Sequence, residues 1–355
     1  MSLLFTPLTI GNYELKNRII MAPLTRGRAI DNGSPNELMA EYYAQRASAG
    51  LIIAEATAVS RDGLGWLNSP GIYTEQQQQG WKKVADAVHH NDGHIFVQLW
   101  HMGSAVHPDF LNGELPYSSS AVKQQGALKT PKGRDREFVT PQALTKPEIA
   151  RVVSDFAEAA RKAVEAGLDG VEIHAANGFL IDQFTRDSVN QREDEYGGNV
   201  ENRLRFMMEV VDAVCQQIGS AKVGIRLSPT NSVWGIKDSN PSETFISAVK
   251  KLNDFNLAYV HVLEPKPGDG SLYLTPELRK HYQGHLFING AYTKDSASEA
   301  LENKEGDGVT FGNQFIANPD LVNRFRSGAE LAIPDSDTFY TDSSKGYTDY
   351  LPMEI

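Results

Sequence analysis

The stretch Gly170-Val-Glu-Ile-His-Ala-Ala-Asn-Gly178 largely decides how this chain is expected to fold. Its first residues are apolar and β-prone, which predicts a short buried strand, and the small and polar residues after them predict a loop. His174 and Asn177 therefore leave the strand together at its carboxyl end, where α/β barrels carry their catalytic residues. An imidazole and a primary amide at this spacing could both donate hydrogen bonds to one carbonyl or nitro oxygen. Taken alone, the pair could equally cap a loop.

Outward from this stretch, short apolar runs alternate with amphipathic segments, the pattern of a parallel sheet covered by helices. Strands are expected at 18–22, 51–55, 94–100, 170–174, 223–228, 259–263, 286–289 and 308–311. Helices are expected near 35–49, 76–91, 147–166, 200–218, 242–255, 276–282, 294–303 and 318–328. Eight of each predicts an α/β fold, a single (β/α)8 TIM barrel spanning residues 1–355 as one domain.

Three segments stand outside this alternation. Residues 1–17 alternate around a Gly-Asn turn, which predicts an N-terminal hairpin that closes the bottom of the barrel. The segment from about 103 to 144 is too long for an ordinary connection; inserted after the third strand, it would lie over the barrel mouth as a lid or pocket wall, or else be a solvated excursion. The aromatic C-terminal tail, 330–355, is expected to pack back on the body.

Composition limits the kinds of partner. With 34 Lys and Arg against 45 Asp and Glu, the net charge of −11 disfavours nucleic acid and anionic membrane as partners. No apolar run reaches the ~18 residues of a membrane span, and the N-terminus lacks the pattern of a signal peptide, so a cytoplasmic location is expected. The single cysteine, Cys215, cannot form an internal disulfide and offers no metal site.

Polar and glycine residues also end other predicted strands. Arg226 ends the fifth strand as a buried cation, and it needs an accepting partner, for which Glu55 and an electron-rich cofactor ring are both candidates. Glycine-bearing turns at 289–291 and 312–313 follow the seventh and eighth strands, the usual phosphate site of barrels. A phosphate-bearing cofactor is therefore expected.

With these features in place, the chain resembles the Old Yellow Enzyme family of FMN-dependent ene-reductases from end to end. The motifs that carry the resemblance, besides 170–178, are Leu15-Lys-Asn-Arg-Ile-Ile-Met-Ala-Pro-Leu-Thr25, Arg46-Ala-Ser-Ala-Gly50, Phe96-Val-Gln-Leu-Trp-His-Met-Gly103, Asp187-Ser-Val-Asn-Gln-Arg-Glu-Asp-Glu-Tyr-Gly-Gly198, Glu201-Asn-Arg-Leu-Arg-Phe206, Phe315-Ile-Ala-Asn-Pro-Asp-Leu321 and Gly346-Tyr-Thr-Asp-Tyr350.

The resemblance implies non-covalent FMN, NADPH or NADH as reductant, and a ping-pong reaction that reduces an electrophilic alkene, a nitro compound or a quinone. It implies a monomer or homodimer without a metal. His174 and Asn177 would bind the substrate oxygen. The implied substrate pocket is Trp66, Trp100, Phe179 and Tyr347, and the implied FMN contacts are Pro23, Leu24, Thr25, Ala56, Gln98, Arg226, Asn289, Gly290, Ala291, Gly312 and Asn313.

Two positions depart from the family pattern. Phe179 stands where most members carry a tyrosine that gives a proton to the substrate α carbon, so water or another hydroxyl would have to act, or nitro, nitrate-ester or quinone acceptors would be favoured. Asn313 stands where the family commonly has an arginine, which predicts weaker retention of the flavin phosphate.

Other interpretations compete with this one. A dienoyl-CoA or dihydroorotate type of flavin barrel would need an iron–sulphur cysteine cluster or a base cysteine, and a barrel aldolase would need a strand-end lysine. The sequence offers none of these. A catalytically retired, flavin-binding barrel remains open, and flavin reduction by a nicotinamide would separate it from an enzyme.

Overall fold

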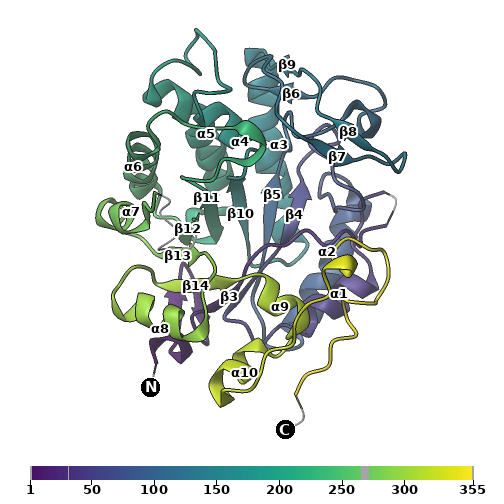
Figure 1. The fold of residues 1–355 in the computed structure, drawn as a ribbon, viewed down its shortest axis with the longest axis vertical. Coiled ribbons are helices and arrows are strands. Elements are labelled where there is room, and N and C mark those ends of the chain that lie inside the picture. The colour runs from purple at the N-terminus through teal and green to yellow at the C-terminus, as the bar shows by residue number, and fades with distance from the viewer. Residues whose placement is uncertain (1, 31, 265–271, 354–355) are drawn as a thin grey trace.

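A closed barrel of eight parallel strands forms the centre of the computed structural model, which describes residues 2–30, 32–264 and 272–353 (Figure 1). Neighbouring strands pair in chain order, and the last pairs with the first. The strands are buried on both faces, as their nearly continuous apolar sequences require. They are β3 (Ile19–Met21), β4 (Leu51–Ala58), β5 (Ile95–Trp100), β10 (Gly170–Ala175), β11 (Val223–Leu227), β12 (Tyr259–Leu263), β13 (Leu286–Asn289) and β14 (Gly308–Phe311). The TIM barrel predicted from the sequence is confirmed.

Helices surround this barrel at the predicted places. They are α1 (Glu37–Ala44), α2 (Glu75–His89), α3 (Lys146–Glu165), α5 (Val200–Ile218), α6 (Pro241–Leu252), α7 (Thr275–His281), α8 (Lys294–Glu302) and α10 (Leu321–Ser327). Two short helices were not predicted, α4 (Leu180–Thr185) and α9 (Asn313–Ala317). Short 3-10 turns span Leu3–Phe5, Pro108–Phe110, Ser220–Lys222, Val233–Gly235, Asn253–Phe255 and Ser336–Thr338.

The N-terminal hairpin closes one end of the barrel. Its strands β1 (Leu8–Ile10) and β2 (Tyr13–Leu15) pair antiparallel. Gly11 in the turn has φ +49, and a Cβ there would lie 2.0 Å from the Ala221 carbonyl oxygen, so the turn requires glycine. The buried hairpin side chains belong to one cluster with residues near the amino ends of the barrel strands, among them Leu51, Phe96, Tyr259 and Phe287.

The insertion after β5 is folded rather than solvated. It carries two small sheets, one of β6 (Tyr117–Ser118) with β9 (Gln142–Ala143) and one of β7 (Ala127–Lys129) with β8 (Asp135–Glu137), seen at the upper right of Figure 1. Its buried side chains Val106, Phe110 and Phe138 form one cluster with Trp100 and Phe179. Because Trp100 ends β5 and Phe179 follows β10, the insertion packs against the carboxyl ends of these strands.

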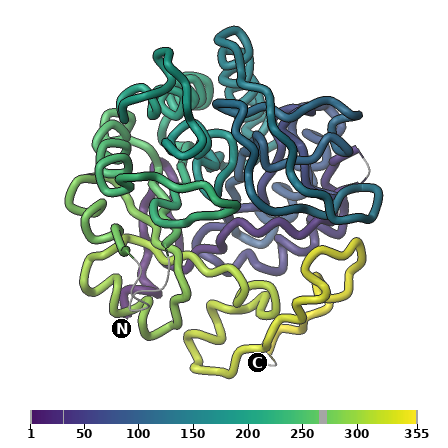
Figure 2. Tube along the Cα trace, turned by 45° about the horizontal axis from the view of Figure 1, so that its top comes forward, coloured from purple at the N-terminus to yellow at the C-terminus, as the bar shows by residue number. Residues whose placement is uncertain are grey.

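The C-terminal tail, yellow in Figure 2, returns from α10 and lies against the body. Tyr347 stacks on Tyr42 of α1, with ring centroids 4.0 Å apart. Arg26 donates to the Gly346 carbonyl, and Arg28 donates to the carbonyls of Phe339 and Thr338. The two arginines after β3 therefore hold residues 338–346 of the tail.

Candidate active site

The barrel register brings the predicted site residues together at one end. His174 of β10 is the strand partner of Arg226 of β11, and Glu172, two residues earlier on β10, is the partner of Gln98 on β5. Since all strands are parallel, His174 and Arg226 lie side by side near the carboxyl edge. Arg226 Nη2 donates to Asn289 Oδ1 over 2.9 Å, which ties the end of β13 to this group.

His174 is buried and packs against the aromatic rings of Trp100 and Phe179. It is 4% exposed, stacks on Trp100 with ring centroids 6.4 Å apart, and meets the edge of Phe179 at 4.8 Å. Burial, with smaller contributions from Arg226 and His261, lowers the pKa of His174 well below its usual value. The imidazole is therefore neutral at pH 7. Its Nδ1 is buried without a hydrogen-bond partner among the described residues.

Asn177 is fixed through both its backbone and its side chain. Its φ is +57, a left-handed conformation that asparagine tolerates better than most residues. The backbone N–H donates to Ser228 Oγ over 2.8 Å, and the side-chain Oδ1 accepts from Asn231 Nδ2 over 3.0 Å. Among the described residues, no hydrogen bond from the NH2 group of the Asn177 amide is found, which leaves this group for a further acceptor.

A buried ion pair between Asp182 and Arg186, which was not predicted from the sequence, stabilises the loop that carries Asn177. Asp182 Oδ2 accepts from the Gly178 N–H over 2.9 Å, and Asp182 Oδ1 accepts from Arg186 Nε over 2.8 Å. Arg186 also donates to the carbonyls of Ser228 and Pro229. The signal available in the sequence was an aspartate and an arginine four residues apart, in a stretch that also holds Leu180, Ile181 and Phe184. The pair joins the loop after β10 to the loop after β11.

Below these residues a chain of polar side chains crosses the barrel. Gln98 Nε2 donates to one oxygen of Glu172 over 2.7 Å, and His261 Nδ1 lies 2.8 Å from the other. His261 Nε2 lies 3.0 Å from Thr310 Oγ1. All four side chains are buried, and the bond to Glu172 fixes the orientation of the Gln98 amide.

Glu55 is not the partner of Arg226, so this part of the prediction is wrong. Its carboxylate accepts from the Arg26 N–H and from the Tyr43 hydroxyl, both over 3.1 Å. The pairing of β4 with β5 shifts register between Ala54 and Thr57, and such a bulge breaks the alternation of side chains around Glu55. Glu172 is the carboxylate that acts on Arg226, where it opposes the lowering of the Arg226 pKa by burial.

The residues expected to contact FMN lie along the carboxyl ends of the barrel strands, a region we call the crescent. Strands β13, β14 and β3 are neighbours, and the partly exposed positions Leu24, Thr25, Asn289, Gly290 and Gly312 follow them. The other predicted contacts continue around the barrel from Pro23 through Ala56 and Gln98 to Arg226, while Ala291 and Asn313 are exposed.

Two observations fit a flat, electron-rich cofactor in this crescent. Arg226 Nε is buried without a partner among the described residues, so it requires an acceptor. A Cβ at Gly312 would lie 3.3 Å from Leu24 Cδ2, so a side chain there would crowd the crescent. These features match what FMN would need, with the ring near Arg226 and the phosphate near the turns after β13 and β14.

An outer cavity of about 630 Å³ lies next to Phe179, which contacts one of the residues that line it. Trp66, Trp234 and Tyr340 line it, together with residues of β7 and β8. Trp234 meets Phe179 at 5.7 Å, and Trp66 meets Tyr340 at 5.4 Å. Trp66 and the insertion therefore both form part of the wall of this cavity.

Tyr347, which was expected as a pocket residue, does not line this cavity. It is fully buried on Tyr42, within contact of Arg26 and Arg28. Tyr340, 60% exposed, is the tail tyrosine that reaches the cavity. Both residues are tail tyrosines, and only the path of the tail over the two arginines decides which one faces the pocket.

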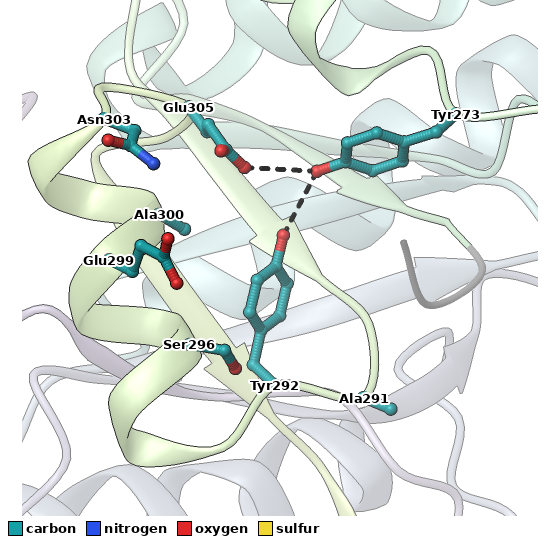
Figure 3. A pocket seen from close by; sticks show the side chains of 8 residues that line it. All are labelled: Tyr273, Ala291, Tyr292, Ser296, Glu299, Ala300, Asn303 and Glu305. Atoms are coloured by element: carbon teal, nitrogen blue, oxygen red, sulfur yellow. Dashed lines mark hydrogen bonds between the residues drawn. The ribbon is translucent and has the colours of Figure 1, made fainter. Parts of the chain in front are cut away.

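A second cavity of about 260 Å³ lies beside the β13–α8 turn. Figure 3 shows the Tyr273 hydroxyl between Tyr292 and Glu305, at 3.3 and 3.5 Å. Ala291 also lines this cavity, but the carboxylates of Glu299 and Glu305 would repel a phosphate group. A phosphate at this turn would instead lie on the barrel side, toward Gly290.

Within residues 2–30, 32–264 and 272–353, two kinds of feature are absent. No group of three or more side chains suited to holding a metal ion was found. No helix there is both long and apolar enough to cross a membrane.

Comparison with known proteins gives close matches over nearly the whole chain. The model of the NADH:flavin oxidoreductase / NADH oxidase family matches residues 3–332. The 12-oxophytodienoate reductase 7 of Oryza sativa subsp. japonica is 41% identical over 370 residues, covering 98% of this chain and 94% of that protein. A probable flavin mononucleotide-dependent alkene reductase of Leishmania infantum is 41% identical over 350 residues, covering 97% and 96%.

Solved structures agree with these sequence matches. The Old Yellow Enzyme homologue of Zymomonas mobilis has 46% identity and a TM-score of 0.96, with 99% of each chain covered. Morphinone reductase in complex with tetrahydroNAD has 43% identity and a TM-score of 0.94, with 99% of this chain and 98% of that chain covered.

Proposed function

Because the chain belongs to the NADH:flavin oxidoreductase / NADH oxidase family, and within it to the Old Yellow Enzymes, we propose that it reduces the activated C=C bond of α,β-unsaturated carbonyl or nitro compounds. It is a flavin oxidoreductase that uses FMN and takes electrons from NADPH or NADH. The named relatives, a 12-oxophytodienoate reductase and a probable alkene reductase, support an alkene as acceptor.

The observation that carries this proposal is the pairing of His174 with Asn177. A neutral imidazole and an amide NH2 group, both fixed by their surroundings, can donate to the two lone pairs of one carbonyl oxygen. Negative charge grows on that oxygen when hydride adds to the β carbon. Each donor to a charged oxygen contributes about 1.5–3 kcal/mol, so two donors lower the barrier substantially.

Other residues would hold the cofactor. When bound, FMN would supply the hydride transfer that links NADPH or NADH to the β carbon of the alkene. Pro23, Leu24, Thr25, Ala56, Gln98 and Arg226 would hold its ring system, and the turns at 289–291 and 312–313 its phosphate. We infer that the nicotinamide and the alkene occupy the same pocket in turn, which is a ping-pong order.

Phe179 bears on the step that follows hydride addition, which is protonation of the α carbon. It packs against His174 and Trp100 at 4.8 Å each, and phenylalanine has no proton to give. We infer that water delivers the proton to the α carbon. The same feature favours a second class of acceptor, nitro, nitrate-ester and quinone compounds, whose reduction needs no proton at that position.

Product formation from 2-cyclohexenone and NADPH tests the proposal. Wild-type protein should form cyclohexanone, and Asn177→Leu should lower kcat/KM by about tenfold or more, because one donor to the oxygen is lost. Asn323→Leu, on the exposed face of α10, is the matched control and should leave the rate unchanged. Equal rates in all three proteins would refute the assigned role of the pair.

A further inference from the structure

We propose that Asn231 is a positioning residue, which orients the Asn177 amide so that its NH2 group, and not its carbonyl, faces the substrate oxygen. The inference rests on the proposed function of the His174–Asn177 pair. It assigns a task to a residue outside the predicted site, in the loop between β11 and the 3-10 turn Val233–Gly235.

The contact between the two amides sets the orientation. Asn231 Nδ2 donates to Asn177 Oδ1 over 3.0 Å, which occupies the acceptor end of the Asn177 amide. A primary amide has a carbonyl end and an NH2 end of nearly equal size, so packing alone distinguishes them poorly. Without a donor at position 231, the Asn177 amide could turn over and present its carbonyl to the substrate oxygen, where two acceptors would repel each other.

The loop that carries Asn231 is fixed relative to Asn177. Ser228, three residues before Asn231, accepts the Asn177 N–H through its Oγ over 2.8 Å, and its carbonyl accepts the Asn231 N–H over 3.2 Å. Arg186, 2% exposed, donates to the carbonyls of Ser228 and Pro229 and is paired with Asp182, which holds the Gly178 N–H. Asn231 therefore meets Asn177 from a braced position.

The chemistry of the side chain at position 231 gives a sharp test. Leucine has the same branched arrangement of heavy atoms as asparagine but makes no hydrogen bond, so the Asn177 amide becomes free to turn. Aspartate has the shape of asparagine but only accepts when ionised, so it should bind the Asn177 NH2 group and turn the carbonyl toward the substrate. The predicted order of function is therefore wild type, then Asn231→Leu, then Asn231→Asp.

The experiment measures binding of p-nitrophenol to the oxidised, FMN-loaded protein by the absorbance of its phenolate. A phenolate oxygen in the site accepts from His174 and Asn177, so its affinity reports the donors without turnover. Asn231→Leu should weaken phenolate binding about tenfold, and Asn231→Asp should weaken it further. FMN content and melting temperature show whether each variant is folded.

The same substitution in a second variant, Asn177→His, distinguishes loss of the Asn177 amide orientation from general damage to the loop that carries Asn231. In Asn177→His the second donor is an imidazole, which has no carbonyl end to turn, so adding Asn231→Leu should change phenolate affinity by less than about twofold. The proposal is overturned if Asn231→Leu binds phenolate as tightly as wild type, or if it weakens binding equally in both backgrounds. If Asn177→Leu itself leaves binding unchanged, the proposed role of the His174–Asn177 pair fails as well.

Discussion

At the residue scale, position 179 carries an aromatic ring without an acidic proton, beside the imidazole that would bind the substrate oxygen. Phe179→Tyr would place a hydroxyl in that position. We expect reoxidation of the reduced flavin by 2-cyclohexenone to become about tenfold faster or more, because a positioned general acid would replace water. Stopped-flow absorbance measures this step directly.

The control for this prediction is Phe339→Tyr, which adds the same hydroxyl in the tail, outside the apolar cluster that contains Phe179 and Trp100. It should leave the rate unchanged. An unchanged rate in Phe179→Tyr would show that proton delivery to the α carbon does not limit the reaction.

The charge state of His174 gives a second prediction at this scale. Burial lowers its pKa well below the usual value of about 6.5, so lowering the pH from 8 to 6 leaves the imidazole neutral. The dissociation constant of 2-cyclohexenone for the oxidised protein should therefore be flat across this range. A titration step near pH 6.5 that disappears in His174→Asn would contradict the assigned charge state.

At the scale of elements, the loops after β10 and β11 depend on one buried ion pair. Asp182 and Arg186 are 1% and 2% exposed, and burial raises the pKa of Asp182 while Arg186 opposes this. Arg186→Met leaves the carboxylate buried without its cation and should lower the free energy of unfolding by about 3–5 kcal/mol. Denaturant titration of the FMN-loaded protein measures the loss.

The matched control is Arg161→Met, which breaks a pair with Glu165 of the same spacing on the surface of α3. Such exposed pairs contribute less than about 1 kcal/mol. Equal losses in the two variants would mean that the Asp182–Arg186 pair does not brace the loops.

The elements themselves could largely be predicted from the sequence, and the exceptions have physical reasons. The barrel strands are short, predominantly apolar runs between turn signals, so each was found. Helix α4 has six residues, all of them buried, and shows no amphipathic stripe. Glu55 was misassigned because a bulge in β4 breaks the alternation of faces. The position of Tyr347 away from the outer cavity could not be predicted, because hydrogen bonds from Arg26 and Arg28 set the path of the tail.

At the scale of the whole molecule, the crescent expected to hold FMN draws on strands from both halves of the chain, so cofactor binding should be linked to global stability. Asn313, exposed at the start of α9, offers no positive charge to the phosphate. Asn313→Arg should slow the loss of FMN on dilution and raise the melting temperature of the holoprotein. Flavin fluorescence follows the release. Asn323→Arg, which adds the same charge on α10, should change neither quantity.

The barrel as a whole could be predicted because its determinants repeat eight times along the chain, whereas the wall of the outer cavity could not. That wall combines Trp66 with Trp234 and Tyr340, which are separated by more than a hundred residues. Asn231 was missed for a similar reason, since its role comes from a contact across two loops.

Anaerobic reduction by NADPH followed by mixing with 2-cyclohexenone tests the central claim most directly. The account predicts that NADPH bleaches the flavin absorbance and that the enone restores it, at a rate that saturates with enone concentration and falls about tenfold or more in Asn177→Leu. A flavin that NADPH reduces but that the enone leaves reduced, while a quinone restores its absorbance, would contradict alkene reduction as the function.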